Sequence, residues 1–129
     1  MDLVAVREEL AEVIRAGASV PVFELPTAAV SAPGVLFGNP RGEWSQTFDG
    51  QVSVSWPLVV IVSRSHPDML SHMAELLSTS TDRSIVDAIN GAAPESCSWW
   101  RPVGWDEWTD LDLGGTSFWA CTVTVEVFG

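Results

Sequence analysis

The sequence predicts an α/β domain of the α+β kind, in which a single, mostly antiparallel sheet has helices packed on one face. Residues 51–64, QVSVSWPLVVIVSR, alternate apolar and other side chains, as do residues 116–128, and this period of two is typical of half-buried strands. Residues 3–16 and the segment after Arg64 instead place apolar residues at helical spacing. The expected order of elements is α-β-β-β-β-α-α-β-β-β. A chain of 129 residues suits one such domain.

The strand expected at 51–64 has one face that is apolar throughout. That face consists of Val52, Val54, Trp56, Leu58, Val60 and Val62. The opposite face is apolar only around Val59 and Ile61, so only the second half of the strand can be covered on both sides. The first half should run past the core as a one-sided ribbon that suits an edge of the sheet. Pro57 has no N–H group to donate and should face an edge or a bulge.

The chain begins with an amphipathic helix, expected over residues 3–16. Asp2 is a suitable N-cap, and Gly17 stands where the helix should stop. The charged residues of its outer face are interpreted as solvated surface and not as a site. They are Arg7, Glu8, Glu9, Glu12 and Arg15. Short strands should follow at 20–24 and 34–38.

A hairpin is expected next, in which residues 43–48 pair with 51–58. The Asp-Gly pair at 49–50 is a signal for a two-residue turn between them. Trp44 and Phe48 then lie on the same side. Because only one face of this hairpin can be packed internally, we expect it to reach beyond its own core.

Two helices should connect the two long strands. The first begins near Pro67 and Asp68. Its buried stripe should consist of Leu70, Met73, Leu76 and Leu77. The second covers 82–90 and ends at an Asn-Gly pair. Its inward residues should be Ile85, Val86 and Ile89.

The last third of the chain predicts strands at 96–103, 109–113 and 116–128, with a bulge or loop at 104–107. The glycines at 114 and 115 offer the positive φ angles of a tight turn. The resulting pairs are Leu111 with Phe118 and Leu113 with Thr116. A competing register has the pairs Cys97 with Cys121 and Trp99 with Trp119. The glycine turn is favoured because it satisfies both the turn chemistry and the alternation.

The charge balance is unusual, with six arginines, no lysine and seventeen acids for a net charge of −11. Such a chain should not hold nucleic acid through its phosphates, because that binding requires Lys and Arg to displace counterions. The lack of lysine excludes a phosphate-loop lysine and a Schiff base. The two cysteines fit a reducing compartment and have no metal-ligand spacing, so both should be reduced and no cofactor is expected.

No transmembrane helix or secretory signal is expected. The longest apolar run, 56–62, is far below the roughly 20 residues that cross a bilayer. The N-terminus, MDLVAVREEL, lacks the basic start and apolar stretch of a signal peptide, which predicts that the chain is made and kept in a cytoplasm.

Catalytic and metal-binding chemistry is not expected either. Asp68 and His72 lie four residues apart, but an acid and a histidine so placed on a helix are usually a solvated pair. His66 and His72 are six residues apart and point in different directions. The acids at 106, 107, 110 and 112 lack the spacing of a calcium loop and are interpreted as an acidic hairpin tip.

Tryptophan is abundant, with seven residues, and four of them lie close together at 99, 100, 105 and 108. A small core cannot bury them all, so exposed Trp should mark a protein interface or a sugar-binding platform. The interface is favoured because a sugar platform also needs amides around the rings, and the chain has only two Asn and two Gln.

Several stretches resemble the tail terminator proteins of long-tailed phages, particularly those of actinobacteria. They are MDLVAVREELAEVI, QVSVSWPLVVIVSRSHPDMLSHMAELL, SIVDAIN and GGTSFWACTVTVEVFG. The resemblance implies a structural virion protein with no catalytic motif, which forms a hexameric ring on the tail tube, stops tube polymerisation and faces the head connector while DNA passes through. The implied partners are other copies of the chain, the major tail tube protein, the connector or stopper, and the genome. The alternatives are a head-to-tail stopper or other neck protein, and a Trp-rich carbohydrate-binding module.

Three groups of candidate site residues follow. The ring interface should use Trp44, Phe48, Val52, Val54 and Trp56. A partner-facing loop should present Trp105, Asp106, Glu107 and Trp108. The candidates for an acidic lumen are Glu43, Asp49, Asp110 and Asp112.

Overall fold

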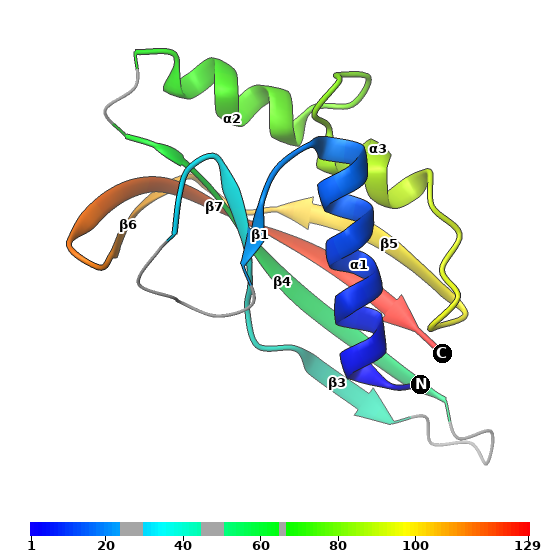
Figure 1. Cartoon of the computed structure of the whole chain (residues 1–129). Helices are drawn as coiled ribbons and strands as arrows, with labels where there is room; N and C mark the ends of the chain where they lie inside the picture. Colours follow the sequence, from blue (N-terminus) through cyan, green and yellow to red (C-terminus); the bar gives the residue numbers. More distant parts are fainter. Residues whose placement is uncertain (24–29, 45–50, 65–66) are drawn as a thin grey trace.

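The computed structural model describes residues 1–23, 30–44, 51–64 and 67–129. It shows a mixed α+β fold in which three helices pack against a curled sheet of seven strands (Figure 1). The elements are α1 (Leu3–Ala18), β1 (Val22–Phe23), β2 (Gly34–Phe37), β3 (Arg41–Trp44), β4 (Val52–Ser63), α2 (Met69–Leu77), α3 (Ile85–Asn90), β5 (Trp99–Trp105), β6 (Thr109–Leu113) and β7 (Thr116–Phe128). The predicted fold class and element order are confirmed.

The two long strands β4 and β7 form the centre of the sheet. They pair antiparallel from Ser53 opposite Phe128 to Ser63 opposite Phe118. Each has two short strands end to end along its outer edge, β3 and β2 beside β4, and β5 and β6 beside β7. Among the strands of the described residues, only β1 joins its neighbour in parallel. The first half of β4 is therefore paired on both sides, which corrects the expectation that it suits an edge.

Pro57 lies where β4 changes partner. β2 pairs with β4 as far as Leu58, and β3 takes over at Ser55. Residues 38–40 thus face the two positions 56 and 57, and the extra residue makes a bulge. The Gly38 N–H donates to the Pro57 carbonyl at 2.8 Å, so this edge of Pro57 faces the bulge. The nitrogen of Pro57 faces the same side, and no ladder hydrogen bond is lost there because the bulge interrupts the ladder. The predicted role of Pro57 is confirmed.

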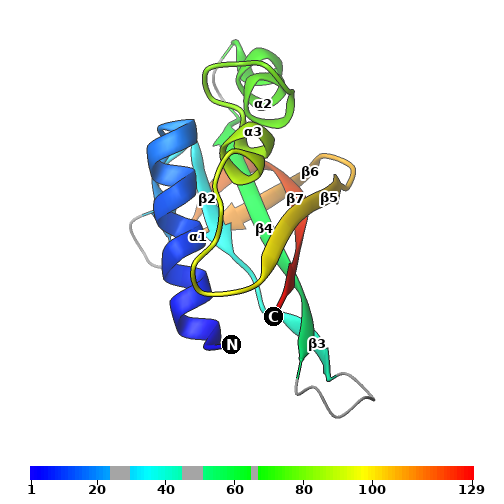
Figure 2. The ribbon, with the colours of Figure 1, turned by 90° about the vertical axis from the view of Figure 1, so that its right-hand side faces the viewer.

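The main core lies between the helices and one face of the β4–β7 pair, and Figure 2 shows α1 on that side of the sheet. The sheet supplies the alternate residues that the sequence predicts. From β4 and β7 these are Val54, Trp56, Leu58, Val60, Val62, Cys121, Val123, Val125 and Val127. A smaller cluster covers the opposite face at Leu36, Ile61, Phe118 and Ala120. The second half of β4 is thus buried on both faces, as expected.

The first helix begins as predicted but ends later. Asp2 is its N-cap, and its carboxylate accepts from the Val4 N–H at 2.9 Å. The helix continues through Gly17 to Ala18, and Ser19 ends it in the left-handed region at φ 54°. Gly17 instead faces α3, because a Cβ built there would lie 2.5 Å from the Ala88 Cβ. The glycine permits close approach of two helices and does not stop one.

The second helix buries Met73, Leu76 and Leu77, but Leu70 is 64% exposed. Leu70 is therefore not part of the buried stripe, and Met69 packs partly against the core in its place. α3 begins at Ile85, three residues later than expected, because the Ser84 hydroxyl caps it by accepting from the Asp87 N–H at 3.1 Å. Ile85 and Ile89 are buried as predicted, while Val86 is half-buried. Across the described residues, no helix is long and apolar enough to cross a membrane.

The hairpin of β6 and β7 has the predicted glycine turn. Gly114 and Gly115 adopt φ angles of 56° and 81°, which side chains rarely permit. Leu111 lies opposite Phe118 and Leu113 opposite Thr116, so the favoured register is confirmed. β5 begins at Trp99 rather than at residue 96, and its pairing with β7 shifts between Pro102 and Gly104, inside a strand that continues to Trp105.

The hairpin of β3 and β4 has a different register from the expected one. Trp44 lies opposite Val52, whereas a two-residue turn at 49–50 would place residue 48 opposite 51. The difference is an odd number of residues, so it turns Trp44 to the face of Val52 and Val54 rather than to the serine face. Residues 45–50, with Phe48, Asp49 and the turn, lie outside the described residues.

Candidate functional site

The hairpin of β3 and the first part of β4 extends past the helices at the lower end of Figure 1. Trp44 is 86% exposed there, more than any other large apolar side chain among the described residues. Val52 is half-buried beside it. The described part of this ribbon, residues 41–44 and 51–55, therefore presents an indole ring that the other described residues leave largely uncovered.

Val54 and Trp56 do not belong to an exposed interface. They are 2% and 4% exposed in the main core. The Trp56 ring meets Phe37 edge-on at 5.8 Å between centroids, and its Nε1–H donates to the Gly38 carbonyl at 3.1 Å. These two residues are corrected to core. Of the other predicted interface residues that the structure describes, Trp44 is on the surface and Val52 is partly buried against the core.

The loop between β5 and β6 presents the predicted Trp and acidic residues. Trp105 is 54% exposed, and its ring centroid lies 6.2 Å from that of the half-buried Trp108. Asp106 and Glu107 are exposed. The Asp106 N–H donates to the Thr122 carbonyl at 3.0 Å, which fixes the loop against β7.

The other two tryptophans of this region are held by their own chain. Trp100 is buried, and its Nε1–H donates to the Ile89 carbonyl at 3.1 Å. Trp99 is 41% exposed, stacks on Phe128 at 5.4 Å and has the Arg101 guanidinium 5.6 Å from its ring. Exposed Trp in this segment is thus limited to Trp99 and to the pair of Trp105 and Trp108, whose rings are inclined by 41° and do not form a flat sugar-binding platform.

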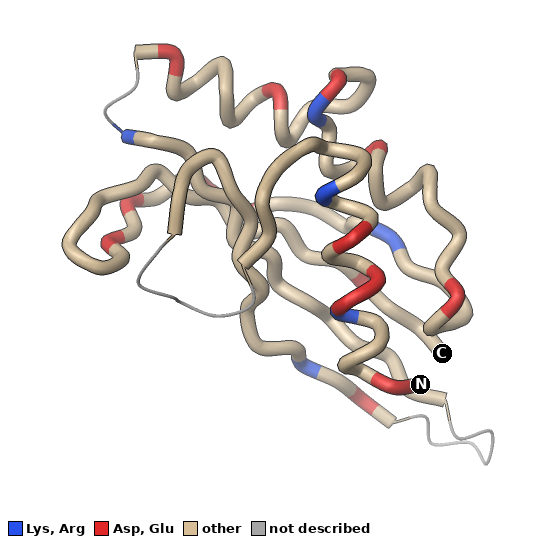
Figure 3. The backbone as a smooth tube through the Cα atoms, viewed as in Figure 1, with Lys and Arg blue, Asp and Glu red and all other residues tan. Residues whose placement is uncertain are grey.

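The candidate lumen acids lie in two places. Glu43 is exposed on β3. Asp110 forms an ion pair with Arg64, and Asp112 accepts from the Ser117 hydroxyl, so both are engaged on the β6–β7 hairpin. Acidic residues also lie along α1 and in the turn before β5 (Figure 3). Among the described residues, no three His, Cys, Asp or Glu side chains are placed to hold a metal ion.

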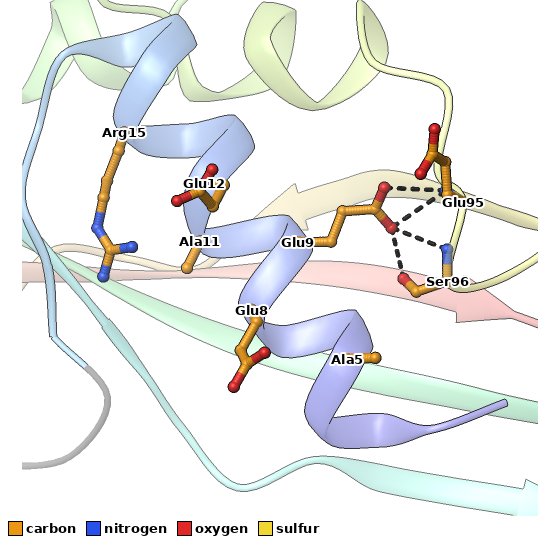
Figure 4. A pocket seen from close by; sticks show the side chains of 8 residues that line it. All are labelled: Ala5, Glu8, Glu9, Ala11, Glu12, Arg15, Glu95 and Ser96. Atoms are coloured by element: carbon orange, nitrogen blue, oxygen red, sulfur yellow. Dashed lines mark hydrogen bonds between the residues drawn. The ribbon is translucent and has the colours of Figure 1, made fainter.

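The outer face of α1 is more than solvated surface. A shallow groove lies between α1 and the segment before β5 (Figure 4). Glu8, Glu9, Glu12, Arg15, Glu95 and Ser96 line it, with Ala5 and Ala11. The Glu9 carboxylate accepts from the backbone N–H groups of Glu95 and Ser96, each at 2.9 Å, and from the Ser96 hydroxyl. Arg15 donates to the Val22 carbonyl at 3.1 Å.

These contacts give Glu9 a structural role. Burial alone would raise its pKa, but the hydrogen bonds from the Ser96 hydroxyl and the two backbone N–H groups outweigh burial and lower the pKa below its ordinary value. Glu9 thereby joins α1 to the segment just before β5. The expectation that this face is only solvated surface is corrected, and its spacing alone could not reveal a partner 86 residues away.

The cysteines are both free thiols. Burial raises the pKa of Cys121 to about 11. Burial, followed by the charge of Glu9, also raises the pKa of Cys97, which is only partly covered. Asp68 and His72 lie at the start of α2, where the His72 N–H donates to the Asp68 carbonyl at 2.9 Å as part of the helix.

Sequence reasoning missed the apolar groups at the start of the chain. Met1, Leu3 and Val4 are 42%, 40% and 53% exposed, at the same end of the molecule as β3 (Figure 1).

The comparison of the chain with protein-family models and with curated proteins finds no match.

Proposed function

We propose that the chain is a structural subunit of a phage tail, which forms a ring on the end of the tail tube as a tail terminator. The observation that carries the proposal is the ribbon with Trp44, whose side chain is 86% exposed although it is one of the largest apolar groups. A single chain leaves this surface in water, and another protein surface would cover it. The resemblance of the long strands and helices to tail terminators is the reason to propose a ring on the tail tube as the assembly.

The charge of the chain supports a conduit for DNA. A net charge of −11 repels a polyanion, and each Lys or Arg that contacts a phosphate would slow its passage. Arg64 and Arg101 are neutralised by Asp110 and Glu126 within the chain. An inner wall with more acids than arginines would let DNA slide without being held.

A head-to-tail stopper is the nearest alternative, since it is similarly small and also forms part of the neck. The two differ in what they bind. A terminator binds the end of the tube that the tail tube protein makes, whereas a stopper binds the connector on the head side.

Polymerisation of the tail tube protein tests the proposal. Tubes of the same virus should grow with and without this chain, and electron micrographs should record their lengths. We expect the chain to shorten the tubes in proportion to its concentration and to add ring-shaped density at one end. Unchanged lengths and bare ends would contradict a terminator, and binding to the isolated connector alone would favour a stopper.

A further inference from the structure

An apolar cavity lies at the end of the molecule opposite the ribbon. It has a volume of about 260 Å³ and lies between the end of α2, the start of α3 and the end of β5. Its lining includes Leu76, Leu77, Val86, Pro102, Val103 and Trp105. None of its lining residues is charged, in a chain with a net charge of −11. Val103 and Trp105, at its mouth, are 49% and 54% exposed.

We propose that Trp44 of one copy inserts into this cavity on the next copy. The inference rests on the proposed ring, and it names the residues that would join neighbouring subunits. The cavity is a concave, uncharged site large enough for one big side chain, and Trp44 is a convex, uncharged group that its own chain leaves exposed. β3 lies at the lower end and α2 at the upper end of both ribbon views (Figures 1 and 2), so a copy cannot fill its own cavity.

The two surfaces differ in the charges beside them. Arg41, also on β3, is exposed and is the one arginine without a hydrogen bond or ion pair among the described residues. Asp106 and Glu107, which follow Trp105 at the cavity, are exposed acids. Arg41 and Glu43 lie opposite Ser55 and Ser53, so both side chains leave the other face of β3, and the face that carries Trp44 brings no acid toward the acids beside the cavity. Copies of so acidic a chain repel each other elsewhere.

The proposed contact joins two different surfaces of the same chain. Such a head-to-tail contact continues from copy to copy and closes into a ring when the rotation between copies allows it. A single indole is not a whole interface, which commonly buries roughly 1,200–2,000 Å². Trp44 would be the central anchor, and the strand and the exposed residues around it would form the rim.

Two variants test the contact from its two sides. Trp44→Ala removes the inserted ring, and Val103→Glu places a charge at the mouth of the cavity. Each should raise the concentration at which copies assemble by at least about thirtyfold. Trp99→Ala, which removes another exposed Trp, should assemble as the wild type does. Native mass measurement gives the assembly state, and circular dichroism shows whether each variant is folded.

Mixing the two variants distinguishes a head-to-tail contact from other modes. The Val103→Glu chain keeps a Trp44, and the Trp44→Ala chain keeps an open cavity, so one intact contact can form and no second can follow. We expect a dimer with one copy of each variant. Variants that stay monomeric when mixed would overturn the proposal, as would a Trp44→Ala chain that assembles like the wild type or a wild type that never assembles.

The outcomes also separate this inference from the proposed function. A ring that persists in Trp44→Ala and still stops tube growth would contradict the contact alone, whereas a ring that needs Trp44 but leaves tube growth unchanged would contradict the terminator alone.

Discussion

Glu9, on the outer face of α1, connects two segments that are distant in the sequence. It accepts hydrogen bonds from Glu95 and Ser96 and so fixes the chain between α3 and β5. Glu9→Gln should lower the free energy of unfolding by about 1 kcal/mol at neutral pH, because an amide oxygen accepts these bonds less strongly than a carboxylate does. Glu12→Gln, on the same face of α1, should change it by less than about 0.5 kcal/mol.

The same residue predicts a pH dependence. Because the pKa of Glu9 is lowered in the folded chain, its stabilisation is present above the unfolded pKa and is lost as the pH falls through the folded pKa. The difference between wild type and Glu9→Gln should therefore shrink below about pH 4. Urea unfolding at several pH values measures this difference in the free energy of unfolding. A difference that stays constant at acidic pH would contradict the stabilising role of the Glu9 hydrogen bonds.

The two thiols should differ in reactivity. With a pKa of about 11, Cys121 is almost entirely a thiol near neutral pH, and its side chain is buried. Cys97 also has a raised pKa but is partly accessible. A disulfide reagent at pH 8 should modify Cys97 slowly and Cys121 only after unfolding, as mass spectrometry of the labelled peptides can show. Equal labelling of both in the folded protein would contradict the burial of Cys121.

At the scale of elements, local chemistry predicted most of the sheet and both long strands. The Gly114-Gly115 turn determines its hairpin register because few other residues adopt those φ angles. The Asp-Gly signal at 49–50 did not predict the register of β3. In the structure Trp44 pairs with Val52 and lies on the same face of the sheet as Val52. Leu70 was misplaced because helical spacing gives a stripe but not which of its edges the sheet covers.

Gly17 offers a test of how α1 and α3 pack. An alanine at a helical position normally stabilises by up to about 1 kcal/mol. Here the added Cβ would meet the Ala88 Cβ at 2.5 Å, so Gly17→Ala should destabilise the fold by about 1–3 kcal/mol. Chemical denaturation of Gly17→Ala, Ala88→Gly and the double variant measures the coupling. Additive effects would show that the two positions do not touch.

At the scale of the whole molecule, the sequence predicted a projecting hairpin but not which of its tryptophans stays outside. Trp44 and Trp56 lie on the same face of the sheet, yet they are 86% and 4% exposed. The difference arises because Trp56 packs into the main core, whereas β3 lies at the lower end of the molecule, level with the start of α1 (Figure 1). The cavity was also beyond prediction, since α2, α3 and β5 meet there only in the folded chain.

The net charge of the molecule predicts that it does not bind duplex DNA. Acids should outnumber arginines on the inner wall of the assembled ring, and the ring should show no measurable binding to duplex DNA at about 0.15 M salt. Fluorescence anisotropy of a labelled duplex, repeated at lower ionic strength, measures this. Salt-sensitive binding, or an inner wall lined mainly by arginine, would point to a DNA-packaging or regulatory partner instead of a conduit.

The mass of the chain in solution, alone and mixed with the tail tube protein, tests the central claim most directly. A terminator should form a closed ring, which the resemblance expects to have six times the 13.9 kDa of one chain, and the ring should join the tube protein as a unit. Native mass spectrometry can count the copies in both samples. A chain that is monomeric in both samples, or that does not bind the tube protein, would contradict the proposal of a terminator.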